Sequence, residues 1–278
     1  MRIADRQEIR YLYMSDHSFT QKKIVRHTHD VVWDKEKIAS YWDVFGNIKP
    51  VSPWFSVKAS GWLLKKINQI LKNKRNNTNT IKILDMGSGS GEFINMVSQQ
   101  TGCQCYGIDL SDERVAIASA EFPAIKFSTG SLTDTGHKSE YFDLIISTQT
   151  IEHLLDEDLE QAFAEMQRIL KPGGTVFLTT RFEEDLQIGR KVCPDCHAVF
   201  LHSQHIQSFT SSRLRRLLDK QGIETIEDGR SRCRDNIHEY VPRRFGWMNL
   251  VLYRIFGNYL DERVGKYLYS IATKPPST

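Results

Sequence analysis

The chain has 278 residues, of which 40% are hydrophobic and 26% are charged. This is the composition of an ordinary globular enzyme, and it excludes a disordered chain, a collagen-like fibre and a disulfide-stapled miniprotein. The length favours one large domain with additions. No stretch approaches the roughly 18 apolar residues of a membrane span, and the first residues carry no apolar signal core, so a cytoplasmic location is expected. Five cysteines without such a signal argue against a disulfide framework.

The net charge of +3 is unevenly distributed along the chain. Residues 1–79 hold fifteen Lys and Arg against seven Asp and Glu, residues 80–180 hold six against fifteen, and residues 181–278 hold sixteen against twelve. Two interpretations fit this pattern. The basic flanks either form ordinary solvated surface or contact an anionic partner.

An N-terminal helical cap is expected over residues 1–79. Apolar side chains recur at helical spacing in residues 34–45 and again in residues 55–71, and a polar tract then ends the second helix. The remaining residues, 80–278, would form the main domain.

Short apolar runs alternate with helical segments from residue 81 to residue 180. The predicted strands are 81–86, 103–110, 125–128, 142–147 and 175–180, and the predicted helices are 92–100, 112–121 and 155–170. Such alternation is typical of a doubly wound α/β fold, in which helices cover both faces of a mostly parallel sheet. A Cys/His-rich loop at 190–206, a helix at 211–220 and a basic aromatic segment at 241–270 follow.

A glycine-rich loop joins the first of these strands to a helix. Gly87, Gly89 and Gly91 allow a tight turn and a close approach of a ligand to the backbone. Asp109 ends the next strand, where a carboxylate can accept hydrogen bonds from both hydroxyls of a ribose. The spacing Gly-x-Gly-x-Gly departs from the pattern of pyrophosphate sites, and Asp85 before it would repel a diphosphate but could hold an ammonium group.

Four segments in order resemble the class I S-adenosylmethionine-dependent methyltransferases. They are the glycine loop 83–93, the tetrapeptide 130–133, the segment 142–154 and the turn 170–178. The resemblance implies a seven-stranded Rossmann-like sheet with S-adenosylmethionine as the cofactor. It also implies roles for individual residues. Gly87, Ser88 and Gly89 would lie beside the methionine part of the cofactor, with Asp85 at the strand end before them, and Asp109 would bind the ribose. Leu110 and Leu132 would enclose the adenine, Ser131 would contact the adenine amine, and Gln149 would face the methyl group. Alternatively, the two leucines are only part of the core.

Two further features are similar to the ubiquinone-biosynthesis O-methyltransferases and, more loosely, to small-RNA 2′-O-methyltransferases. These are the run 38–43 and the pair formed by Glu152 and His153. In both groups a Glu-x-x-Glu-His segment binds a divalent metal, whereas here Gln149 replaces the first glutamate. His153 and His205 are the expected catalytic bases for deprotonating an acceptor hydroxyl, with His153 favoured.

The loop 190–206 carries potential ligands for zinc. Cys193, Cys196, His202 and His205 form the predicted tetrahedral set, with His197 and Cys233 as rival ligands. The alternatives are a loop without metal and, with less support, a redox role for the two cysteines. A second possibility for His205 is a position over the acceptor.

The acceptor expected from these features is a small or carrier-linked metabolite. Arginines alternate with aromatic residues between 241 and 270, a pattern suited to an anionic or lipid-linked acceptor or to a membrane surface, although the aromatic side chains could equally pack against the sheet edge. Two other functions remain open: nucleic-acid methylation or binding, and NAD(P)-dependent reduction. Against a reductase, the sequence has no Tyr-x-x-x-Lys pair at a place where it could protonate a carbonyl.

Overall fold

The structure is a computed structural model that describes residues 28–46, 54–72, 81–232 and 265–276. Within these residues, seven strands form one large sheet in the order β4-β3-β2-β5-β6-β10-β9. The strands are β2 (Lys82–Met86), β3 (Gln104–Asp109), β4 (Lys126–Thr129), β5 (Phe142–Thr148), β6 (Leu170–Arg181), β9 (Glu224–Ser231) and β10 (Tyr267–Thr273). Strands β2 to β6 are parallel, and β10 runs antiparallel to both of its neighbours.

The order of the strands reverses beside β2. The chain moves outward from β2 through β3 to β4, and then crosses back to place β5 on the other side of β2. In a sheet of this kind, the reversal leaves a crevice at the carboxyl ends of the strands, where ligands bind. The predicted α/β fold with a mostly parallel seven-stranded sheet is confirmed.

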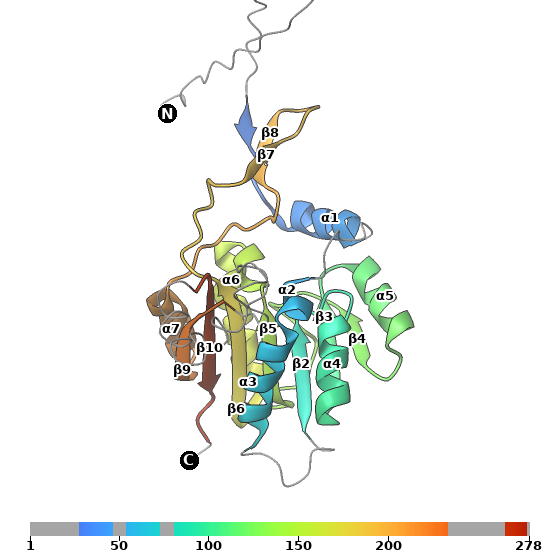
Figure 1. Cartoon of the computed structure of the whole chain (residues 1–278), viewed down its shortest axis with the longest axis vertical. Helices are drawn as coiled ribbons and strands as arrows, with labels where there is room; N and C mark the ends of the chain where they lie inside the picture. Colours follow the sequence, from blue (N-terminus) through green and yellow to red (C-terminus); the bar gives the residue numbers. More distant parts are fainter. Residues whose placement is uncertain (1–27, 47–53, 73–80, 233–264, 277–278) are drawn as a thin grey trace, which may run out of the picture.

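Helices cover both faces of the sheet (Figure 1). The helices are α3 (Ser60–Lys72), α4 (Glu92–Thr101), α5 (Asp112–Glu121), α6 (Asp156–Ile169) and α7 (Ser211–Lys220). Leu63 of α3 and Ile94 of α4 pack with Ile83 of β2 on one face, whereas Phe163 of α6 and Leu214 of α7 pack on the other. All five side chains are almost fully buried. Adjacent residues of the parallel strands point to opposite faces, which explains their continuous apolar runs.

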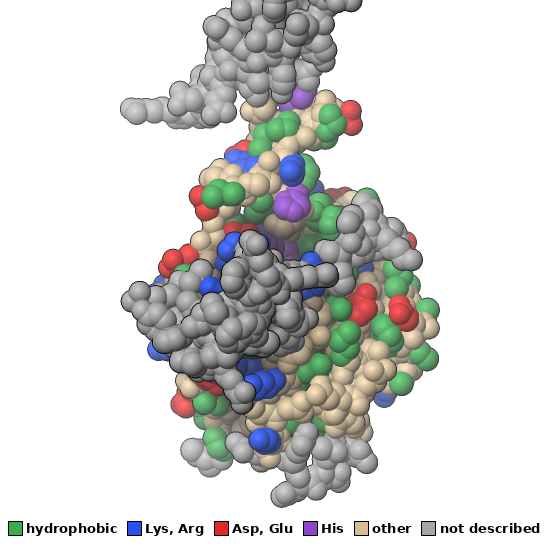
Figure 2. Space-filling model, viewed as in Figure 1, with side chains coloured by type: hydrophobic (Ala, Val, Ile, Leu, Met, Phe, Trp, Pro, Cys, Tyr) green, Lys and Arg blue, Asp and Glu red, His purple; other side chains and the backbone are tan. Residues whose placement is uncertain are grey.

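A short helix and a small sheet lie beyond the carboxyl ends of the parallel strands. Helix α1 (Lys35–Gly46) crosses above these ends, and α2 (Phe55–Lys58) leads into α3 (Figure 1). Strand β1 (His29–Asp30) pairs with β8 (Ala198–Leu201), which forms a hairpin with β7 (Arg190–Val192). Figure 2 shows histidine side chains along this projection and where it joins the body.

The structure differs from the sequence predictions at three places. Strand β6 begins at Leu170, because residues 171–174 form an irregularity within the strand and not a turn before it. The 190–206 loop contains a β-hairpin. Strands β9 and β10 were not predicted from the sequence. Most of the 241–270 segment lies outside the described residues, as does the candidate ligand Cys233. No described helix is long and apolar enough to cross a membrane.

Candidate cofactor and acceptor site

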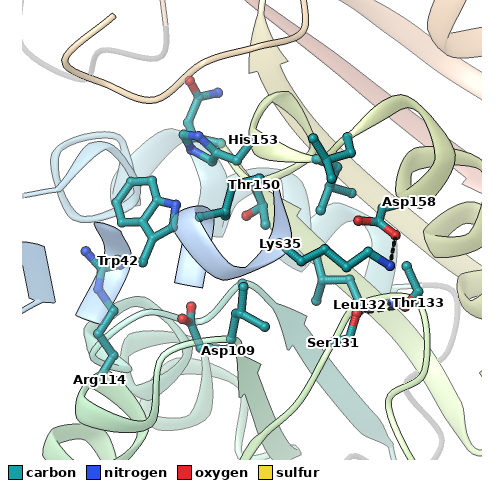
Figure 3. A pocket seen from close by; sticks show the side chains of 16 residues that line it. Lys35, Trp42, Asp109, Arg114, Ser131, Leu132, Thr133, Thr150, His153 and Asp158 are labelled. Atoms are coloured by element: carbon teal, nitrogen blue, oxygen red, sulfur yellow. Dashed lines mark hydrogen bonds and ion pairs between the residues drawn. The ribbon is translucent and has the colours of Figure 1, made fainter. Parts of the chain in front are cut away.

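A cavity of about 290 Å³ lies at the strand-order reversal, under α1 (Figure 3). One side, here called the strand wall, consists of residues that follow the parallel strands: Gly87, Asp109, Leu110, Ser131, Leu132 and Gln149. The opposite side, called the cap wall, consists of Lys35, Ile38 and Trp42 of α1. Most of the predicted cofactor residues therefore line one cavity. The other three, Asp85, Ser88 and Gly89, lie in the strand and loop beside it.

The glycine loop is fixed by its backbone. Gly87 has φ +85°, and a Cβ added there would lie 2.3 Å from the Thr150 side chain. The Gly87 N–H donates to the Ile108 carbonyl at 2.8 Å, and the Gly89 N–H donates to Asp109 Oδ2 at 2.8 Å. The loop and the end of β3 thus hold each other in place. Only a residue without a side chain fits at Gly87.

The two aspartates predicted for the cofactor site have different environments. Asp109 is 8% exposed, and its Oδ1 and Oδ2 accept from Ser111 N–H and Gly89 N–H. Asp85 lies below the loop and is 1% exposed, with no hydrogen-bond partner on Oδ1 among the described residues. Burial, and then the negative charge of Asp109, raise the pKa of Asp85 to about 7. A cation bound above Asp85 would favour its ionised form.

The predicted adenine end of the cavity is apolar with a polar edge. Leu132 is 7% exposed and belongs to the core, whereas Leu110 is 40% exposed and also lines the cavity. Ser131 Oγ and Thr133 Oγ1 lie 2.7 Å apart and share a hydrogen bond. An exposed leucine above the cavity has an apolar face available for a flat ring.

The cap wall is attached to the body by side chains. The Lys35 ammonium pairs with Asp158 at 2.7 Å, and the Trp42 indole N–H donates to Gln204 Oε1 at 2.9 Å. The Trp42 ring lies 4.8 Å from that of His153. Figure 3 shows Trp42 between His153 and Arg114, at the edge of the cavity.

A cluster of carboxylates and imidazoles borders the cavity, and is called the histidine cluster: Glu152, His153, Glu184 and His205. Ligand atoms of Glu152, His153 and His205 lie within 4.8 Å of one another, close enough to share one metal ion. His205 Nδ1 lies 2.5 Å from Glu184 Oε2. The rings of His153 and His205 are 4.9 Å apart. The structure thus brings together the two predicted catalytic histidines and adds a carboxylate that orients one of them.

Burial controls the protonation of this cluster. It lowers the pKa of His153 to about 3, with a further contribution from His205, and it raises the pKa of Glu152 to about 7. Burial also raises the pKa of Glu184, but the hydrogen bonds and charges of His205 and Arg181 together outweigh it, and the net pKa lies below the usual value. His153 is therefore neutral near pH 7, and Glu184 is ionised.

Three residues around the cluster have a backbone conformation that is rare outside glycine. Gln149 after β5, Glu183 after β6 and Gln204 after β8 have φ values of 53°, 43° and 55°. With its amide oriented to satisfy both groups, Gln149 donates to Glu152 Oε1 and accepts from Thr180 N–H, each at 3.2 Å. Such strained positions concentrate at functional sites, where the surrounding structure holds them.

The four predicted zinc ligands do not come together among the described residues. The group of potential metal ligands contains His205, but neither cysteine nor His202. Cys193 and Cys196 lie in the hairpin turn between β7 and β8, which projects from the body, whereas His205 has returned to the cluster. The hydrogen bond to Glu184 occupies Nδ1 of His205. The zinc set is therefore not supported: the hairpin separates ligands that are close in sequence.

The fold and the cavity define a class I S-adenosylmethionine-dependent methyltransferase. The chain belongs to the family described as "Methyltransferase domain", whose profile matches residues 57–228. Demethylmenaquinone methyltransferase of Chlorobaculum parvum is 32% identical over 97 residues, which cover 35% of this chain and 39% of the relative. Ajmaline N-methyltransferase of Rauvolfia serpentina is 33% identical over 110 residues, 37% of each chain. The chain thus spans less than two fifths of these curated relatives.

Solved structures share the fold. A geranyl diphosphate methyltransferase in complex with GPP and sinefungin has a TM-score of 0.57 at 13% identity, over 86% of this chain and 98% of its own. Phosphoethanolamine N-methyltransferase 2 of Haemonchus contortus, in complex with S-adenosyl-L-methionine, has a TM-score of 0.53 at 20% identity, over 86% of this chain and 57% of its own. At these identities, the likeness concerns the fold alone.

Several residues of the site could not be recognised from the sequence pattern. The sequence predicts a helix at Trp42 and places it in the run 38–43, but gives it no place in the site, and it predicts no role for Arg114, Glu184 and Gln204. One signal was available for Glu184, because a carboxylate just after a strand of this sheet lies at its functional edge. Arg114 gave no comparable signal, since one arginine in the first turn of a helix is ordinary.

Proposed function

We propose that this chain transfers the methyl group of S-adenosylmethionine to a hydroxyl of a small or carrier-linked metabolite. The observation that carries the proposal is the His205–Glu184 pair beside the cofactor cavity. An alcohol is a weak nucleophile that must lose its proton during transfer, so a base at this position favours a hydroxyl over an amine.

The proposed reaction uses this pair as its base. The acceptor oxygen attacks the methyl carbon, a C–O bond forms, and the C–S bond breaks with its electron pair left on sulfur, giving S-adenosylhomocysteine. The proton passes to Nε2 of His205, and the carboxylate of Glu184 stabilises the resulting imidazolium through Nδ1. The low pKa of His153 makes it a poor proton acceptor, so His205 replaces it as the favoured base. Neutral His153 lines the cavity, and in this proposal it hydrogen-bonds the acceptor.

The acceptor class is tested with methyl-labelled S-adenosylmethionine. The protein is incubated with a total metabolite extract and, separately, with total RNA. Label in an O-methylated small molecule supports the proposal. Label in RNA alone, or in an N-methylated product, contradicts it and points to the alternative acceptors represented among methyltransferases.

The base is tested with the labelled product as readout. His205→Ala should lower kcat/KM by roughly 10²- to 10⁴-fold, with partial rescue by added imidazole. Glu184→Gln should lower it by roughly tenfold. His202→Ala is the matched control, because His202 lies nearby outside the cluster. A chelator should leave the rate unchanged. Loss of activity that a divalent metal restores would instead make Glu152, His153 and His205 metal ligands.

A further inference from the structure

Arg114 of α5 is a buried cation whose charge is not paired with a carboxylate among the described residues. It is 8% exposed, and its Nε and Nη2 atoms are buried with no hydrogen-bond partner in that part of the chain. Asp109 is the largest negative charge acting on Arg114, but backbone N–H groups already bond both of its oxygens. Burying an unpaired guanidinium is unfavourable, so its retention here needs a reason.

Two tryptophans hold the Arg114 guanidinium in position. Its central carbon lies 4.8 Å from the ring centroid of Trp42 and 4.6 Å from that of Trp54. Contacts with ring faces stabilise the planar cation without using its N–H groups, which stay available for a planar anion. Because Trp42 lies on α1 and Trp54 precedes α2, the N-terminal elements fix an arginine of the main domain.

Arg114 lies where the amino-acid part of the cofactor is expected. It lines the cavity, and its Nη1 would be 3.3 Å from a Cβ added at Gly89. The cofactor has one anionic group, its α-carboxylate, which the nearby Asp85 and Asp109 would repel. The other cation among the described lining residues, Lys35, is paired with Asp158.

We propose that Arg114, held between Trp42 and Trp54, binds the α-carboxylate of S-adenosylmethionine. The inference rests on the proposed use of this cofactor and deepens it. The carboxylate would satisfy the buried N–H groups with charge-assisted hydrogen bonds. Bound cofactor would then link the strand wall to the cap wall through one residue, which makes Arg114 a determinant of cofactor specificity.

The experiment compares S-adenosylmethionine with decarboxylated S-adenosylmethionine, which lacks only the carboxylate. Calorimetric affinities are measured for the full chain, Arg114→Met and Arg114→Lys. Arg114→Met should lose roughly 10- to 100-fold in affinity for S-adenosylmethionine and less than about threefold for the decarboxylated analogue. The affinity of Arg114→Lys for S-adenosylmethionine should lie between those of the parent chain and Arg114→Met. The matched control is Arg230→Met, since Arg230 stacks on Phe182 at 4.5 Å outside the cavity lining.

Thermal unfolding separates binding from a structural role. Without cofactor, Arg114→Met should unfold at or above the temperature of the parent chain, because it removes unpaired buried N–H groups. Equal losses for both ligands, or unchanged cofactor affinity with a raised KM for the acceptor, would overturn the assignment. If Arg114→Met does not fold, equal losses for both ligands in Arg114→Lys would overturn it instead. A parent chain that binds neither ligand would refute the proposed function itself.

Discussion

The strand wall and the cap wall of the cavity differ in how far apart their stabilising partners lie along the chain. The Gly87 N–H donates to the Ile108 carbonyl and the Gly89 N–H donates to the Asp109 carboxylate, and both hydrogen bonds lie within one strand-helix-strand unit. Trp42 of the cap wall depends on Gln204, which is 162 residues away. The strand wall is therefore built by local topology, whereas the cap wall exists only once distant segments have packed.

This difference has a functional consequence. The strand wall carries residues predicted to hold the cofactor, and at Gly87 the neighbouring Thr150 leaves no room for a side chain. The cap wall closes the cavity through aromatic and charged side chains, which can change without breaking the sheet. Substitutions on the strand wall should therefore abolish binding, and those on the cap wall should weaken it.

The largest effect is expected from Gly87→Ala. The new methyl group would overlap Thr150 at 2.3 Å, at a φ of +85° that alanine disfavours, so cofactor affinity should fall by more than roughly a hundredfold. Calorimetric titration measures the loss. Gly222→Ala is the control, because Gly222 has a φ of +69° but nothing within 4 Å of the added atom. Equal effects of the two substitutions would show that backbone strain, and not crowding, is responsible.

Asp109→Ala should follow. It removes the carboxylate expected to bind the ribose hydroxyls and also the bond that holds the Gly89 N–H, so affinity should fall by about a hundredfold, or roughly 2–3 kcal/mol. Asp112→Ala removes an exposed acid from the first turn of α5, three residues after Asp109, and serves as the control. Retained affinity in Asp109→Ala would remove Asp109 from the cofactor site.

Trp42→Ala should have a smaller effect on the same titration. The substitution removes the ring contacts with His153 and Arg114 and the hydrogen bond to Gln204. Because these contacts hold Arg114 and α1 beside the cavity, cofactor affinity should fall by roughly thirtyfold. Trp33→Ala changes another tryptophan near α1 that lies outside the cavity lining. If Trp42→Ala weakens binding as much as Gly87→Ala, the proposed distinction between the two walls is wrong.

The smallest effect is a pH dependence of cofactor binding through Asp85. With a pKa of about 7 in the free protein, Asp85 holds a proton below that pH. A cationic ligand favours the carboxylate and lowers this pKa, so affinity should be roughly tenfold weaker at pH 6 than at pH 7.5. The cofactor affinity of Asp85→Asn should not change over this pH range. The same variant also reports any effect that comes from titration of the ligand itself. A flat profile in the parent chain would place the cofactor's ammonium elsewhere.

The sequence by itself determined the five parallel strands, the glycine loop and the acid that follows it. Alternating apolar runs fix a parallel sheet because both faces of each strand are buried, and the ligand-facing loops follow from where the strands end. Within the described residues, helices α5 and α7 have the bounds that spacing predicted, since their caps at Ser111 and Thr210 are local hydrogen bonds.

Only the tertiary structure decided which side chains reach the cavity from segments outside the strand-helix-strand unit of the glycine loop. The hairpin β7–β8 carries Cys193 and Cys196 away from His205, so closeness in sequence does not bring the predicted zinc ligands together. Packing brings His205 to Glu184 and His153, and places Arg114 between Trp42 and Trp54. These contacts join segments many residues apart, and their energies depend on burial, which spacing along a chain does not encode.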